Sequence, residues 1–140
     1  MAKRIVLLRG VNLGARNRIA MPELRDALAD AGFRDVRTSL QSGNVVLSSA
    51  ASPEWTARKC EQVIAYRFRL AINVVVRTRD ELAEVVQSNP LRKVAVNPRR
   101  HQVTFMTAEP DREAVGKLTV AAVPPEQFVV VGREIYAWHP

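Results

Sequence analysis

A basic loop rich in glycine and asparagine separates an apolar run from a helical pattern in LLRGVNLGARNRIAMPEL, residues 7–24. Its glycines and asparagines adopt positive φ readily, so successive backbone N–H groups can turn toward one anion. Arginines in the loop could add bidentate contacts to a phosphate. The string RGVNLG is neither a Walker loop nor a dinucleotide fingerprint, so a plain surface connection is the alternative. The residues expected to bind a ligand here are Arg9, Gly10, Asn12, Gly14, Arg16 and Arg18.

The net charge of +7 is unevenly distributed along the chain. Residues 1–22 contain five basic residues and no acidic residue, and residues 85–108 contain four basic residues, again without an acid. If the two segments meet in space, they form a positive face suited to phosphate or another polyanion. The alternative is an arginine-rich composition that leaves solvated patches without a partner. This prediction adds Arg99 and Arg100 to the candidate ligand-binding residues.

The side chains that most often carry catalysis form no recognisable constellation. His101 and His139 lack a partner at motif spacing, and no histidine, cysteine and carboxylate residues have the spacing of a metal site. Ser42 and Asn44 flank a predicted tight turn without the motif of a serine nucleophile, and they are kept as candidate ligand-binding residues. The sequence predicts no metal and no cofactor, and it leaves open whether the protein is an enzyme.

Aromatic residues near the end of the chain offer two interpretations. Tyr136 and Trp138 have the i, i+2 spacing that places both on one side of a strand, with Phe105 as a potential neighbour. They could form a stacking platform for bases, as in single-strand-binding proteins. Packing in the hydrophobic core is the favoured interpretation, because the same side of the strand can face helices.

The elements that must position these residues follow from hydrophobic periodicity and from turn residues. Helices are predicted from Pro22 to a Gly32 stop with Phe33 against Leu28, from Pro53 after a Ser52 cap, from the Thr78–Glu81 capping box, and from Pro110. Cys60 lies on an apolar helix face and is predicted to fill the core. Strands are predicted at 4–8, 36–40, 45–47, 72–76, 103–107, 128–131 and 134–138, with two-residue hairpin turns at Gly43-Asn44 and Gly132-Arg133.

The order of elements predicts an α+β fold built from two ferredoxin-like halves. The first half, residues 1–77, has the order strand, helix, strand, strand, helix, strand, which is that of the split β-α-β plait. Residues 78–140 are predicted to form a second, incomplete plait. Both sheets should be mostly antiparallel, with helices on one face.

The composition, 47% hydrophobic and 25% charged, is that of a globular protein. No apolar stretch approaches the roughly 18 residues of a membrane span, and no secretory leader is evident, so a cytoplasmic protein without membrane contact is predicted. The single cysteine, Cys60, is consistent with a reducing compartment.

The stretches LLRGVNLG, MPELRDALADAGF and LQSGNVVL closely resemble a bacterial family known as domain of unknown function 1697. The resemblance continues through VVVRTRDELAEVVQSNP, HQVTFM and GREIYAW and so covers essentially the whole chain. It implies two plait-like halves and brings no activity, cofactor or catalytic residue. Members of the family usually continue into a further helical region, which this chain appears without, so an uncovered apolar face in the second half is expected to favour self-association.

Three functional hypotheses follow. The leading one is a binding module whose basic surface accepts a phosphate-bearing ligand or nucleic acid. The second is an enzyme or sensor for a small anionic metabolite held between the halves, with Asn12, Ser42 and Asn44 as polar ligands. The third is a structural or assembly module that self-associates, for example as a homodimer.

Overall fold

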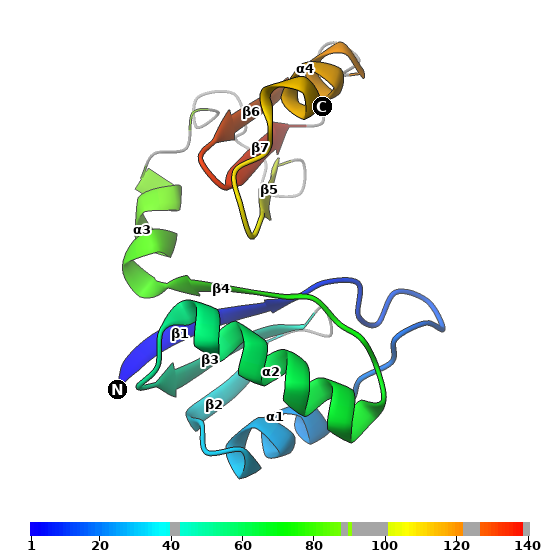
Figure 1. Cartoon of the computed structure of the whole chain (residues 1–140), viewed down its shortest axis with the longest axis vertical. Helices are drawn as coiled ribbons and strands as arrows, with labels where there is room; N and C mark the ends of the chain where they lie inside the picture. Colours follow the sequence, from blue (N-terminus) through cyan, green and yellow to red (C-terminus); the bar gives the residue numbers. More distant parts are fainter. Residues whose placement is uncertain (40–42, 88–89, 91–100, 122–126, 139–140) are drawn as a thin grey trace. The chain divides into compact units, whose positions relative to one another are not determined.

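The computed structural model describes residues 1–39, 43–87, 90, 101–121 and 127–138 (Figure 1). The chain divides into two compact units, Met1–Leu82 and Ala83–Pro140. Together they make an α+β protein with two antiparallel sheets and helices. Within the described residues, no helix is both long and apolar enough to span a membrane.

The first unit is a four-stranded antiparallel sheet with two helices packed on one face (Figure 1). Its strands have the spatial order β2-β3-β1-β4. The order along the chain is the one predicted for this half. The elements are β1 (Ala2–Leu8), α1 (Met21–Asp30), β2 (Arg34–Ser39), β3 (Asn44–Ser49), α2 (Pro53–Phe68) and β4 (Val74–Thr78).

The core of the first unit lies between this sheet and the two helices. Alternate strand residues point toward the helices because successive side chains of a strand face opposite sides. Buried strand residues meet Leu24 and Leu28 of α1 and Cys60 and Ile64 of α2. The predicted core position of Cys60 is confirmed. The strand residues in this core are Val6, Leu8, Val45, Leu47, Val74 and Val76.

The predicted helix end at Gly32 is confirmed in detail. Gly32 has φ +102°, and its N–H donates to the Ala29 carbonyl at 3.0 Å. The Phe33 N–H donates to the Leu28 carbonyl at 3.2 Å, and both side chains lie in the core. These two bonds and this apolar contact define a Schellman motif.

The hairpin between β2 and β3 differs from the prediction. Asn44 pairs with Ser39, so it is the first residue of β3, and the connection consists of residues 40–43. The predicted two-residue turn at Gly43-Asn44 is therefore wrong. Gly43 does have positive φ, +86°, and a Cβ there would lie 2.7 Å from Val11 Cγ2. Glycine is required because the backbone closely approaches the loop after β1.

The second unit contains a three-stranded antiparallel sheet of order β5-β7-β6. The predicted two-residue turn at Gly132-Arg133 is confirmed, because Val131 pairs with Glu134. The elements here are α3 (Arg79–Gln87), which begins in the first unit, β5 (His101–Phe105), α4 (Arg112–Ala121), β6 (Gln127–Val131) and β7 (Glu134–Trp138).

Tyr136 is the centre of the core described in the second unit. It is buried against Val85, with partly buried Val103, Phe105 and Val129 around it, and its hydroxyl donates to the Val85 carbonyl at 2.9 Å. Burial, together with the Glu134 and Glu84 charges, raises the pKa of Tyr136. The core interpretation is confirmed for Tyr136 and Phe105, whereas the side chain of Trp138 lies outside what the structure describes.

Candidate anion-binding site in the loop after β1

The loop between β1 and α1 has the backbone geometry that its composition predicts. Gly10, Asn12, Gly14 and Asn17 all have positive φ, between +50° and +67°. A Cβ on Gly10 or Gly14 would meet nothing within 4 Å, so these glycines serve the backbone conformation rather than close packing. Repeated entry into the left-handed region folds the loop back on itself, which is the conformation from which anion-binding concavities are built.

Asparagine side chains hold this loop closed. Asn12 Nδ2 donates to the Ile19 carbonyl, and the Ile19 N–H donates to Asn12 Oδ1, both at 2.9 Å. Asn17 Nδ2 donates to the Gly10 carbonyl at 3.0 Å, and the Asn12 N–H donates to the Asn17 carbonyl at 3.0 Å. Val11 and Ile19 are buried in the core at either end. The loop is therefore an ordered platform, and the Asn12 amide acts as its clasp.

Three arginines project from this platform. Arg9, Arg16 and Arg18 are all exposed. None of them forms a side-chain hydrogen bond or ion pair with any residue that the structure describes. Residues 1–22 contain no acid, so no carboxylate of this segment competes with an anionic ligand for these guanidinium groups.

Two further segments lie against the base of the loop. The Leu8 N–H donates to the Gly43 carbonyl at 3.1 Å, and the Arg9 N–H donates to the Asn73 carbonyl at 3.0 Å. Asn44 is half-buried and pairs with Leu7. The structure thus brings Asn44 to the sheet edge that carries the loop, as the sequence hypothesis requires.

Helix α1 begins directly after the loop. Its N-cap is Ala20, which provides no side-chain capping bond, and Pro22 occupies the first turn. The uncapped first turn leaves partial positive charge beside the arginines.

The remaining candidates are not placed together with this loop. Ser42, Arg99 and Arg100 lie outside the described residues. The expectation that the two acid-free segments share one face therefore stays a prediction.

Chemistry elsewhere in the described part of the chain is limited. No group of three or more histidine, cysteine or carboxylate residues could hold a metal ion there. Burial, and secondarily the Glu61 charge, raises the pKa of Cys60 from 9.0 to about 12, so its thiol stays protonated at neutral pH.

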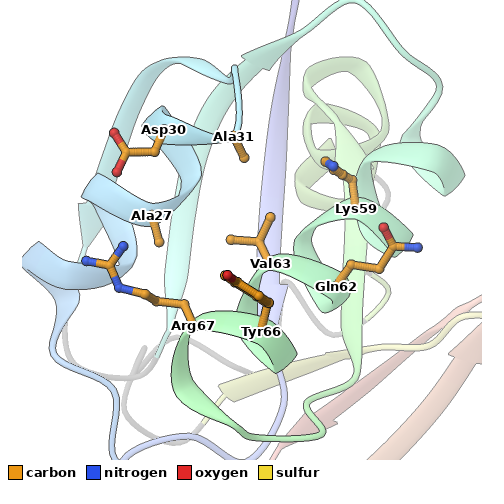
Figure 2. A pocket seen from close by; sticks show the side chains of 8 residues that line it. All are labelled: Ala27, Asp30, Ala31, Lys59, Gln62, Val63, Tyr66 and Arg67. Atoms are coloured by element: carbon orange, nitrogen blue, oxygen red, sulfur yellow. The ribbon is translucent and has the colours of Figure 1, made fainter.

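A groove of about 360 Å³ runs between α1 and α2. Figure 2 shows Ala27 and Ala31 of α1 facing Val63 of α2 across this groove, with Tyr66 at its rim. Tyr66 is 83% exposed. The groove combines an apolar floor with an exposed aromatic ring, and sequence periodicity did not reveal it because it arises where two helices meet.

The fold and the basic loop define an α+β protein with a candidate anion-binding site and no described catalytic centre. The chain belongs to the family described as protein of unknown function (DUF1697), which it matches over residues 1–136. It is similar in structure to a conserved bacterial protein, SP0830 from Streptococcus pneumoniae, with a TM-score of 0.79 and 22% sequence identity. That match covers 98% of this chain and 76% of the other, and at this identity it shows the fold alone. No curated protein matches the chain significantly.

Proposed function

We propose that this protein is a binding module that takes a phosphate-bearing ligand, nucleic acid foremost, on the loop formed by Arg9–Arg18. The observation that supports this most strongly is the set of three exposed, unpaired arginines on a loop held closed by Asn12 and Asn17. An ordered loop loses little conformational entropy when a ligand binds, so more of the electrostatic attraction is retained as affinity.

The architecture of the first unit agrees with this proposal. Its antiparallel strand order and chain order are those of a ferredoxin-like plait, and plaits of this kind include RNA-recognition domains. The strands of this sheet carry no aromatic residue, so base stacking on the sheet is not part of the proposal. Affinity should depend on phosphate charge and vary little with base sequence.

The test is fluorescence anisotropy of labelled single- and double-stranded oligonucleotides over a range of salt concentrations. Arg9→Gln, Arg16→Gln and Arg18→Gln should each weaken binding and make the log–log salt slope shallower by about 0.9 per lost duplex contact. Arg25→Gln is the matched control, because it removes the same charge from an exposed arginine of α1 that pairs with Asp26 at 3.6 Å. Affinity that ignores salt and the three loop variants would disprove the proposal.

The metabolite hypothesis has less support. Asn12, one of its three polar ligands, already spends its amide oxygen and amide nitrogen on Ile19. Ser42, another, lies outside the described residues.

Self-association is the second candidate function, and the outer face of α2 favours it. Trp55 is 54% exposed and Tyr66 is 83% exposed, and they lie three helical turns apart on one side of the helix. Two large aromatic side chains on one solvent-facing stripe are a typical feature of protein interfaces. Sedimentation velocity should show a concentration-dependent dimer that the double variant Trp55→Gln/Tyr66→Gln abolishes. Val86→Gln, at an exposed apolar residue of α3, should leave it intact, and a monomer at every concentration would refute this candidate.

A further inference from the structure

A second basic cluster lies on the sheet face of the first unit that α1 and α2 leave open. Strand pairing places Ser48 of β3 between Lys3 of β1 and Arg34 of β2. In the next row of the same face, Arg37 pairs with Val46. Lys3, Arg34 and Arg37 are exposed, and none has a side-chain hydrogen bond or ion pair to another residue in the described part of the chain. Three unneutralised cations therefore share one small area.

A β-bulge hollows the sheet at this point. The register between β2 and β3 shifts between Arg34 and Arg37, and Asp35 within the bulge has φ +52°. A bulge bends its strand and redirects side chains, so it creates relief on an otherwise flat sheet. The resulting depression measures about 470 Å³, within the range of small-molecule sites. Its polar lining comes from Lys3, Asp35, Arg37, Thr38, Ser39 and Ser48.

The lining has the chemistry of a site for a phosphorylated polyhydroxy compound. Lys3 and Arg37 supply the cations that a phosphate needs. Asp35 accepts a hydrogen bond from the Ser48 hydroxyl at 3.4 Å, which is long enough that a ligand hydroxyl could compete for the carboxylate. Ser39 offers a further hydroxyl on the same rim.

We propose that this depression binds a small phosphate monoester that also carries hydroxyl groups, such as a sugar phosphate. Lys3 and Arg37 hold the phosphate, and Asp35 accepts from a hydroxyl group of the ligand. The site is separate from the loop after β1, because Lys3 and Arg9 lie six residues apart along β1, or about 20 Å at 3.3 Å per residue. The inference therefore stands or falls independently of the proposed nucleic-acid binding.

The test is a titration of the full-length, isotope-labelled protein with ribose 5-phosphate, followed by two-dimensional NMR. Saturable shifts are expected at residues 3, 35–39 and 46–48. Lys3→Gln and Arg37→Gln should each weaken binding about fivefold, the loss expected for one exposed charge pair. Asp35→Asn keeps a residue that tolerates positive φ, and it should weaken ribose 5-phosphate while leaving inorganic phosphate unchanged.

Arg16→Gln is the matched control, since it removes one charge from the other basic site and should leave ribose 5-phosphate binding unchanged. Ribose without phosphate should not bind. The proposal is overturned if ribose 5-phosphate causes no saturable shift in the millimolar range, or if its shifts map to residues 9–18. It is also overturned if a single-stranded oligonucleotide saturates residues 35–39 while ribose 5-phosphate does not.

Discussion

Gly43 links the start of β3 to the loop that follows β1, and its lack of a side chain allows this contact. A Cβ at Gly43 would lie 2.7 Å from Val11 Cγ2 and 2.9 Å from Leu8 Cβ, both in the buried core. Gly14 also has positive φ, +61°, but a Cβ there would meet nothing within 4 Å. The two positions therefore separate the cost of a steric clash from the cost of a backbone conformation.

We predict that Gly43→Ala destabilises the protein by about 3 kcal/mol, combining overpacking with the left-handed backbone penalty. Gly14→Ala should cost only about 1 kcal/mol, because it meets the backbone penalty alone. Chemical denaturation of the two variants measures the difference. Equal losses would mean that the loop moves away from Gly43 at little cost.

Cys60 gives the first unit a specific response to alkaline pH. Burial raises the pKa of its thiol from 9.0 to about 12, so the folded protein retains the proton between these values while the unfolded chain releases it. Because the folded state then binds more protons than the unfolded state, the free energy of unfolding must fall as pH rises above 9.0.

We predict that this loss is smaller in Cys60→Ala, even though that variant is less stable at neutral pH through loss of buried volume. Urea denaturation at a series of pH values between neutrality and the alkaline limit measures it. Tyr136, whose pKa is also raised, adds a loss of the same sign in both proteins. Parallel stability curves for the two proteins would exclude a contribution from Cys60.

At the scale of elements, the helix ends show which features can be predicted from sequence. The Thr78–Glu81 capping box is confirmed, with the Thr78 N–H donating to Glu81 Oε1 at 2.9 Å and the Glu81 N–H donating to Thr78 Oγ1 at 3.0 Å. The Ser52 cap also forms, accepting from the Trp55 N–H at 3.1 Å. Such signals lie within one turn of chain, so their physical cause is contained in a short string of residues.

We predict that Ser52→Ala lowers stability by about 1 kcal/mol, the usual cost of losing an N-cap, or about 4 °C in Tm. Ser52→Asp is the control, because aspartate caps equally well and adds a favourable charge at the helix N-terminus. Differential scanning calorimetry compares the variants with the parent. A Tm for Ser52→Ala equal to that of Ser52→Asp would show that the Trp55 N–H is satisfied by water.

Features that depend on strand register were not predictable from sequence. The two-residue hairpin at Gly43-Asn44 was wrong because pairing with Leu7 and Ser39 draws Asn44 into β3. The cluster on the open sheet face was missed for the same reason, since Lys3 meets Arg34 only through Ser48 of an intervening strand. The bulge at Asp35 carries no glycine or asparagine that would signal its positive φ.

The candidate loop was partly predictable. Glycine and asparagine indicated the left-handed backbone at Gly10, Asn12 and Gly14. The bond from Asn17 to the Gly10 carbonyl and the Asn12 clasp on Ile19 depend on the folded path of the chain, and no spacing rule specifies them.

At the scale of the whole molecule, the charge can be divided because the first unit contains its own core. Every residue of the core cluster between α1, α2 and the first sheet lies within Met1–Leu82. A fragment of residues 1–87, which keeps α3 and its capping box, should therefore fold alone with a cooperative unfolding transition. Circular dichroism and NMR dispersion check this expectation, and an unfolded fragment would contradict it.

This fragment tests which basic segment contributes to binding. It retains Arg9, Arg16 and Arg18 but lacks the four basic residues of the second acid-free segment, Arg92, Lys93, Arg99 and Arg100. If the loop after β1 is the primary site, the folded fragment binds oligonucleotides and still loses affinity in Arg16→Gln. If the second segment also contacts phosphates, the full chain has a steeper salt slope by about 0.9 for each duplex contact that the fragment lacks. A folded fragment without affinity would move the binding site out of the first unit, because its loop and its fold are then both intact.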